Sequence, residues 1–267
     1  MRRVSSRIRL RRVWLISVCV IAAVQVAVGV AGLALSLAGV EWQREPGIPD
    51  WQRAITIIAS CALSAYLLLG ARRDERVEHL GAFFLLVAVF FAIRPIWALV
   101  VILPEPGAGL ARLLQSFAVD AFTPVLVWLF FRDFPRTLES PRMARLFRVA
   151  IGVSIAAAVG LIAVNLLIGL RVDAGALSRF DHARSVSHYW TIVFGLILPA
   201  LPIAFWRARR APLDERRRVG FFVGGLILAP IPTILYAILP TLSPEIEAFW
   251  QRDFVIAVLR PVSLAMI

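Results

Sequence analysis

Long apolar runs alternate with short polar segments along the whole chain. Seven full runs and the start of an eighth are bounded by charged or turn-forming residues. Each full run is close to the roughly 20 residues that a helix needs to cross about 30 Å of hydrocarbon. The full runs lie at Val13 to Val40, Ala54 to Gly70, Leu80 to Leu103, Leu113 to Phe131, Val149 to Leu170, Tyr189 to Trp206 and Val219 to Leu239, and the eighth begins at Phe254. The pattern predicts an all-α polytopic membrane protein whose residues 1–267 form one transmembrane domain.

Composition supports this interpretation, because 60% of the 267 residues are hydrophobic. Ordinary soluble domains contain about half. The connecting segments are too short to hold a soluble domain, and two of them carry clear turn residues at Pro46-Gly47 and Pro106-Gly107. A lipid bilayer is therefore the expected environment.

Arginine is distributed unevenly between the two sets of loops. The N-terminus and the second, fourth and sixth loops carry 20 Arg, the other loops carry 7, and 2 lie inside apolar runs; Lys is absent. Cytoplasmic loops of membrane proteins accumulate basic residues, so the N-terminus is predicted to be cytoplasmic. The net charge of +12 is explained by topology and anionic headgroups rather than by nucleic acid, which we do not expect to bind. The lack of Lys is typical of a GC-rich bacterial genome. The apolar runs and the Arg distribution predict a multi-pass protein of the bacterial inner membrane.

The eighth run, Phe254 to Ile267, is shorter than a full span. From a cytoplasmic N-terminus, a completed eighth span returns the chain to the cytoplasm, where an output domain is expected beyond residue 267. If seven spans are the full number, the C-terminus lies on the outer side.

Familiar catalytic signatures do not occur in the sequence. It contains no His-Glu-x-x-His helix, no Gly-x-Ser-x-Gly turn and no Gly-rich phosphate loop followed by Lys. His182 and His188 are six residues apart, a spacing that does not bring them together on one helix face. The residues therefore predict no metal site, no cofactor and no catalytic residue, and whether a longer protein is an enzyme stays open.

Charged side chains inside the apolar runs are the strongest candidates for a site, because a charge at membrane depth is costly without a partner. Arg94 lies in the third run, Asp120 in the fourth and Arg260 in the eighth, and Asn165 adds a polar side chain to the fifth. If the helices are straight, a rise of about 1.5 Å per residue places all four at a similar depth in the outer half of the membrane.

Two interpretations of this polar layer stay open. In one, Arg94 and Asp120 form a structural ion pair while Arg260 reaches the outer interface. In the other, the layer is the floor of a pocket that receives an anionic small molecule or a peptide from outside, with Trp97 beside it and with Pro95, Pro124 and Pro261 loosening the helices. The candidate ligand-binding residues are Arg94, Trp97, Asp120, Asn165 and Arg260.

Glycine and proline mark further features of the apolar runs. Gly152 and Gly160 in the fifth run, and a Gly-x-x-x-Gly at Gly220 in the seventh, are expected to allow close helix contacts. Packing within the chain is the default for these contacts, and a homodimer is the alternative. Pro199 and Pro202 are expected to kink the sixth run.

Two segments carry a family resemblance. The fourth run ends in Trp128-Leu129-Phe130-Phe131-Arg132-Asp133-Phe134-Pro135-Arg136, and Asp214-Glu215-Arg216-Arg217-Arg218-Val219-Gly220 leads into the Gly- and Pro-containing seventh run. Together they resemble the multi-span N-terminal sensor region of bacterial histidine kinases of the ComP quorum-sensing type, over roughly residues 120–267. The resemblance implies a downstream dimerisation helix, a phospho-accepting His and an ATP-binding domain in a two-component system, none of them within this chain.

These observations favour the sensor module of a bacterial signal-transduction protein that relays an extracytoplasmic ligand to a cytoplasmic output domain. The alternative is a small transporter or channel subunit that uses Arg94 and Asp120 as a coupling pair. Transporters often consist of two matching halves, and no such halves are visible in the sequence.

Overall fold

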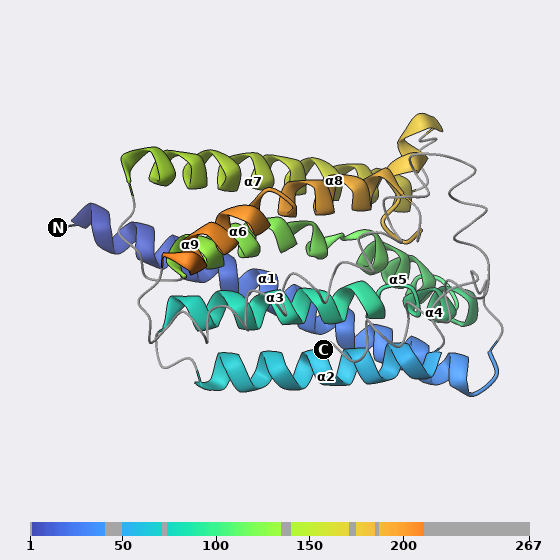
Figure 1. Cartoon of the computed structure of the whole chain (residues 1–267). Helices are drawn as coiled ribbons and strands as arrows, with labels where there is room; N and C mark the ends of the chain where they lie inside the picture. Colours follow the sequence, from blue (N-terminus) through green and yellow to red (C-terminus); the bar gives the residue numbers. More distant parts are fainter. Residues whose placement is uncertain are drawn as a thin grey trace, which may run out of the picture. The chain divides into compact units, whose positions relative to one another are not determined.

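In the computed structural model, the described residues are 2–40, 50–70, 74–134, 140–170, 175–184 and 187–210, with side chains from residue 12 onward. All regular structure in these ranges is helical, which confirms the predicted all-α class for them (Figure 1). The elements are α1 (Arg2–Leu37), α2 (Asp50–Gly70), α3 (Glu75–Ala92), α4 (Ile96–Ile102), α5 (Gly107–Ser116), η1 (Val119–Phe122), α6 (Thr123–Asp133), α7 (Pro141–Gly169), η2 (Gly175–Phe180), α8 (His188–Ile197) and α9 (Ala200–Arg209).

Five segments are long and apolar enough to cross a membrane, and a sixth is added if the bent pair α3 and α4 counts as one span. The six segments coincide with the first six apolar runs of the sequence. The predicted seventh run, Val219 to Leu239, and the eighth from Phe254 lie outside the described residues. The number of seven full spans and a truncated eighth therefore stays a prediction.

Contacts divide the chain into two compact units, Met1–Asp120 and Ala121–Ile267. Helices α1 to α5 belong to the first unit and α6 to α9 to the second, while η1 contains the boundary between them.

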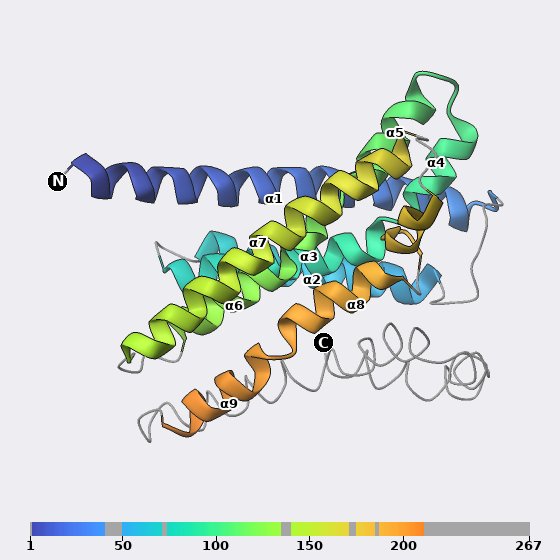
Figure 2. The ribbon, with the colours of Figure 1, turned by 90° about the horizontal axis from the view of Figure 1, so that it is seen from above.

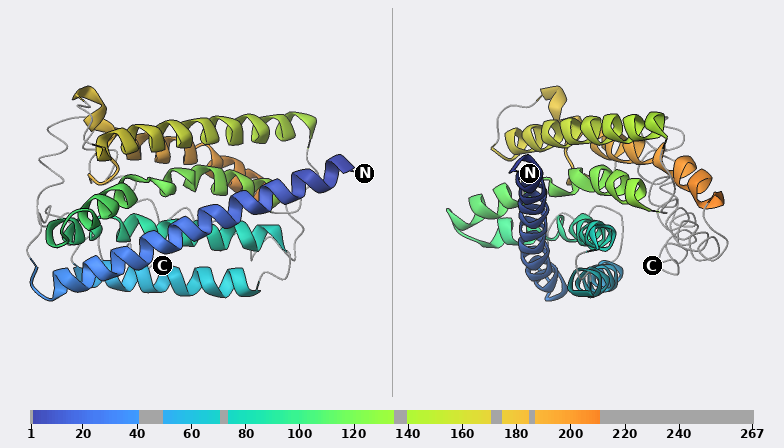
Figure 3. Two further views of the ribbon diagram at one scale, coloured as in Figure 1. Left: turned by 180° about the vertical axis from the view of Figure 1, so that it is seen from behind. Right: turned by 90° about the vertical axis from the view of Figure 1, so that its left-hand side faces the viewer.

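In the first unit, α1 crosses α3 obliquely and meets α2 near its own C-terminal end (Figure 3). Most of its buried positions follow one another in steps of three and four residues, which is the spacing of one helix face: Leu15, Val18, Ala22, Gln25, Gly29, Gly32 and Ser36, with Val26 and Leu33 next to this row. The helix stops at Gly39, whose φ of 95° suits glycine. There the Val40 N–H donates to the Leu35 carbonyl at 3.1 Å and the Gly39 N–H to the Ser36 carbonyl at 3.1 Å, a Schellman end.

Helix α2 has its polar face inside and its apolar face outside. The side chains buried beside α3 include Gln52, Arg53, Thr56, Ser60 and Ser64. The exposed side chains are mainly large and apolar: Trp51, Ile55, Ile58, Tyr66 and Leu69. A water-soluble bundle has the opposite pattern, whereas lipid as the solvent favours this one.

The second unit is built around α6, in which every residue from Pro124 to Phe131 is buried. Helices α7, α8 and α9 contact it, and Figure 2 shows the interruption between α8 and α9. The N-terminus of α7 is fixed by Ser140, whose Oγ accepts the Met143 N–H at 3.3 Å, and by Pro141 at the first helical position. The helix is interrupted where a kink was predicted at Pro199, because α8 ends at Ile197 and α9 begins at Ala200. No interruption occurs at Pro202, which lies in the first turn of α9.

Candidate functional site

The third span is broken at Arg94 and Pro95, and its halves α3 and α4 are bent by 44°. Proline has no N–H to donate, so the regular i to i−4 hydrogen bonds cannot continue through it. Beyond the break the chain tightens, with the Trp97 N–H donating to the Arg94 carbonyl at 3.0 Å. The Ile93 carbonyl, which would accept that N–H in a regular helix, instead accepts the Gln115 side-chain amide at 3.4 Å. A buried glutamine of α5 therefore closes the break between α3 and α4, in the sense that its side chain supplies the hydrogen bond that the helix lacks there.

The fourth span is also broken, at Phe117 and Ala118, between α5 and η1. The Ala118 N–H donates to the Ser116 carbonyl at 3.0 Å, which deprives the Leu114 carbonyl of its helical donor. Gln25 of α1, which is completely buried, supplies the replacement: its Nε2 donates to the Leu114 carbonyl at 2.8 Å and also to the Phe117 carbonyl. A second buried glutamine therefore closes the second break, as expected where irregular backbone lies at membrane depth.

Glycines bring α1 against the first of these breaks. A Cβ added at Gly29 would come closer than 3.0 Å to backbone atoms of Ala92, and one added at Gly32 closer than 3.0 Å to backbone atoms of Pro95. The two glycines follow Gln25 on the same helix face, at the following turns. One face of α1 thus supports both breaks, by a side-chain amide at one and by direct backbone contact at the other.

Replacing Gln25 with leucine is expected to destabilise the first unit by about 2 kcal/mol, because the buried Leu114 carbonyl would lose its donor and the Phe117 carbonyl would keep only the Val119 N–H. Gln25→Glu should be at least as harmful, since a carboxylate has no amide N–H to donate. Thermal unfolding of the purified chain in detergent measures both changes. Gln25 Oε1 has no hydrogen-bond partner among the described residues, so leucine removes only the two bonds that Nε2 donates. A Gln25→Leu variant as stable as the wild type would therefore mean that these bonds contribute nothing to stability.

The predicted site residues of the first unit all lie at or near the two breaks. Arg94 is half-buried between α3 and α4, Trp97 stands on α4 with 36% exposure, and Asp120 is 1% exposed in η1. Their equal depth was inferred from straight helices, and that reasoning was wrong: the third span bends at Arg94 itself, and the fourth begins at Gly107 and is interrupted before Asp120. Whether Arg94 and Asp120 face each other stays a hypothesis.

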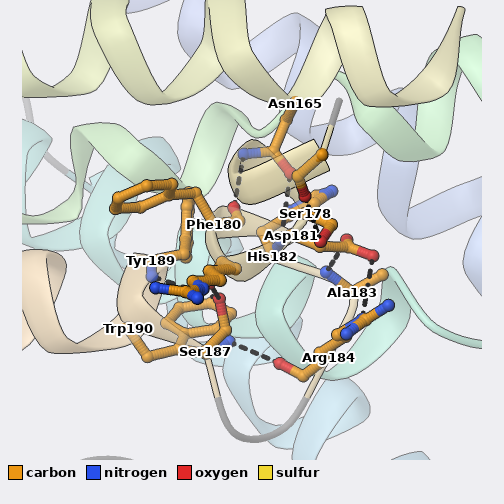
Figure 4. A network of polar contacts seen from close by, with 12 residues as sticks. Asn165, Ser178, Phe180, Asp181, His182, Ala183, Arg184, Ser187, Tyr189 and Trp190 are labelled. Carbon is orange, nitrogen blue, oxygen red and sulfur yellow. Dashed lines mark hydrogen bonds and ion pairs between the residues drawn. The ribbon is translucent and has the colours of Figure 1, made fainter. Parts of the chain in front are cut away.

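In the second unit, Asn165 holds the loop between α7 and α8 (Figure 4). Its amide Nδ2 donates to the Phe180 carbonyl at 3.0 Å and to the Leu161 carbonyl at 2.9 Å, and its Oδ1 accepts the His182 N–H at 3.0 Å. Farther along the loop, Ser187 Oγ donates to the Arg179 carbonyl at 3.0 Å. The Asn165 side chain is engaged by the backbone of the chain itself. Arg260, the remaining candidate, lies outside the described residues.

Replacing Asn165 with alanine is expected to speed tryptic cleavage after Arg179 or Arg184 about tenfold, because the loop would lose bonds that are each worth about 1 kcal/mol. Trypsin applied to one face of sealed membrane vesicles measures the rate and also tests the predicted outer location of this loop. Ser154→Ala, on the same helix and equally buried, is the matched control and should leave the rate unchanged. Equal rates in the Asn165→Ala variant and the wild type would contradict an anchoring role.

Another group of buried polar contacts lies in the second unit, where the C-terminal ends of α6 and α9 meet. Arg207 of α9 is 2% exposed. Its guanidinium donates to the Phe131 carbonyl and, at 3.0 Å, to the Arg132 carbonyl, both in the last turn of α6. It also lies 5.3 Å from the centre of the Phe147 ring. A cation is favourable at a helix C-terminus, where unpaired carbonyls concentrate negative charge.

Trp128 continues this cluster toward the break between α8 and α9. Its Nε1 donates to the Leu196 carbonyl in the last turn of α8 at 2.9 Å, and its ring meets Phe147 edge to face at 5.8 Å. Trp128 and Arg207 therefore attach both halves of the sixth span to α6. The first four residues of the motif, Trp128 to Phe131, are buried in the last turns of α6, which is the central helix of the second unit.

Two buried arginines were placed wrongly by the sequence pattern. Arg207 was assigned to the sixth loop and Arg53 to the first loop, yet both lie within helices and are at most 5% exposed. The two arginines counted inside apolar runs, Arg94 and Arg260, are therefore joined by Arg53 and Arg207, which also lie within spanning helices. The glutamines were missed because only charged side chains and Asn165 were considered, although Gln25 is a visible polar interruption of the first apolar run.

The described residues include no group of three His, Cys, Asp or Glu side chains suited to a metal ion. The fold and its buried polar clusters are those of an all-helical protein with several helices compatible with a membrane. No protein-family model, curated protein or solved structure matches the chain.

Proposed function

We propose that the chain is the membrane-embedded sensor module of a bacterial signal-transduction protein, multi-pass in the inner membrane with a cytoplasmic N-terminus. In this proposal a small molecule or peptide binds from the outer side, and the helices pass the resulting shift to a cytoplasmic output domain, which the family resemblance suggests is a histidine kinase.

The observation that carries the proposal is the pair of linked breaks in the first unit. The short helices α4 and α5 pack against each other. Helix α4 begins just after the first break and α5 ends just before the second, and a glutamine side chain from another helix donates hydrogen bonds at each break. Hydrogen bonds of 2.8 and 3.4 Å from Gln25 and Gln115 tolerate small rotations more readily than a continuous helix does. The α4 and α5 pair can thus move as a body and transmit that movement to α1 and α3.

The same contacts weigh against the transporter alternative. Transporters with broken helices use the unwound carbonyls to coordinate their coupling ions. Here the carbonyls of Ile93, Leu114 and Phe117 already accept hydrogen bonds from glutamine side chains. Breaks closed in this way support a hinge more than an ion site.

Two measurements separate the functions. A reading frame that continues past Ile267 into a kinase or phosphatase domain supports the sensor, whereas a stop codon within a few residues favours the transporter. In proteoliposomes under an imposed proton or potassium gradient, the sensor should carry no flux. A flux that disappears in Asp120→Asn would overturn the proposal.

The ligand site is tested by adding fractions of conditioned culture medium to the purified protein and following its thermal stability. Asp120→Asn, Arg94→Gln and Arg260→Gln should each reduce any stabilisation produced by an active fraction. If all three variants respond as the wild type does, the pocket hypothesis is excluded while the topology is untouched.

A further inference from the structure

The C-terminal turns of α9 carry two arginines stacked on two aromatic rings. The Arg209 guanidinium carbon lies 4.4 Å from the centre of the Phe205 ring, and that of Arg210 lies 3.9 Å from the Trp206 ring. Phe205 is 48% and Trp206 44% exposed, and both arginines are exposed. Two parallel cation–aromatic pairs, each spanning one helical turn, thus form one accessible surface.

The opposite face of α9 is buried, and this determines which way the Phe205, Trp206, Arg209 and Arg210 surface faces. Ala200, Ala204 and Ala208 are buried at successive turns, and small residues of this kind allow close helix packing. Arg207 is buried on the same side, with its guanidinium on the last carbonyls of α6. The rotation of α9 is therefore fixed, and the Phe205, Trp206, Arg209 and Arg210 surface is turned away from α6.

The chemistry of this surface matches a phosphate at a membrane interface. A guanidinium stacked on a ring keeps its in-plane N–H groups free, and these suit two phosphate oxygens at once. Tryptophan rings settle at the depth of lipid headgroups. The predicted topology places this end of α9 on the cytoplasmic side, where anionic lipids attract basic residues.

We propose that Phe205, Trp206, Arg209 and Arg210 bind the phosphate of an anionic phospholipid of the phosphatidylglycerol class. Arg209 and Arg210 hold the phosphate oxygens, and the two rings lie against the upper acyl chain. This proposal rests on the proposed membrane location and topology but not on the sensor role, so the gene-reading and flux experiments can fail without affecting it.

The test uses the full chain in lipid nanodiscs that contain dibrominated phosphatidylglycerol or dibrominated phosphatidylcholine at equal mole fraction. Bromine quenches nearby tryptophan, and the difference between wild type and Trp206→Phe isolates Trp206 among the eight tryptophans. Phosphatidylglycerol should quench Trp206 more strongly than phosphatidylcholine. This preference should fall about fivefold for each arginine changed to glutamine, and Arg209→Lys with Arg210→Lys should retain part of it.

The matched control is Arg145→Gln with Arg148→Gln, which removes the same charge from exposed positions near the N-terminus of α7. That variant should keep the full preference. An unchanged preference in the Arg209→Gln, Arg210→Gln double variant would show that these arginines do not bind the lipid. An equal loss in the control would show that only general charge attraction operates. Either result would overturn the proposal. A preference abolished by excess inorganic phosphate would make the ligand a soluble anion and would overturn the lipid assignment.

Discussion

Replacing Gly32 with alanine is expected to destabilise the first unit by about 3 kcal/mol, at the upper end of the range for overpacking. The added methyl group would come closer than 3.0 Å to the Pro95 carbonyl. Backbone cannot move aside as a flexible side chain can, so α1 would have to separate from the break between α3 and α4. Gln25 on the same face would then lose its alignment with Leu114. Thermal unfolding in detergent, with the midpoint followed by tryptophan fluorescence, measures the loss.

Gly160→Ala supplies the matched control, because the same change is made in the middle of a long helix. A Cβ at Gly160 meets no atom of the described chain within 4 Å. Alanine is favoured over glycine in a helix by about 1 kcal/mol, so this variant should be slightly more stable than the wild type. The two substitutions are therefore expected to differ in sign. A Gly32→Ala chain that gained stability would show that α1 does not press against the break.

The sequence predicted the positions of the first six spans because hydrocarbon demands long apolar runs. It predicted the kink at Pro199 and loosening at Pro95 because proline removes a backbone donor wherever it stands. The break at Phe117 and Ala118 escaped prediction. It contains no proline, and its freed Leu114 carbonyl is satisfied by Gln25, 89 residues away. No local pattern in the sequence records such a distant donor.

The sites of close helix contact were predicted less well. Gly152 and Gly160 were expected to allow close packing within the chain, but a Cβ at either position meets nothing within 4 Å in the described part of the chain. The close contacts with the backbone of another segment are made by Gly29 and Gly32 instead. Glycine spacing shows where a helix could approach another, whereas the rotation of each helix about its axis decides which glycines are used. That rotation depends on tertiary contacts such as those of Gln25.

The residues of the candidate site were also predicted only in part, because sequence context does not show which tertiary contacts a side chain makes. Charge inside an apolar run drew attention to Arg94 and Asp120. Both lie at or near helix breaks and Asp120 is 1% exposed, while their role in ligand binding stays a prediction. Arg207 could not be recognised in this way, because it stands next to further arginines at the end of an apolar run. An arginine that caps a neighbouring helix and an arginine that faces lipid headgroups have the same sequence context there.

Replacing Arg207 with methionine is expected to destabilise the second unit by about 3 kcal/mol. Hydrogen bonds that involve a charged group are each worth about 1.5 to 3 kcal/mol, and two carbonyls in the last turn of α6 depend on this guanidinium. Methionine retains much of the side-chain volume, so the loss reports the bonds and the charge rather than a cavity. Arg207→Lys should recover only part of the stability, because an ammonium lacks the planar arrangement of donors.

The control is Arg145→Met, which removes one arginine from an exposed position on α7 and should change stability by no more than about 0.5 kcal/mol. The structure also predicts where the damage appears. Without Arg207, α9 should detach from α6 while α8 stays attached through Trp128 and the Leu196 carbonyl. Hydrogen exchange should therefore rise in α9 and in the last turn of α6, and much less in α8. Uniform exchange across all three helices would mean that Arg207 stabilises the whole unit rather than the junction of α6 and α9.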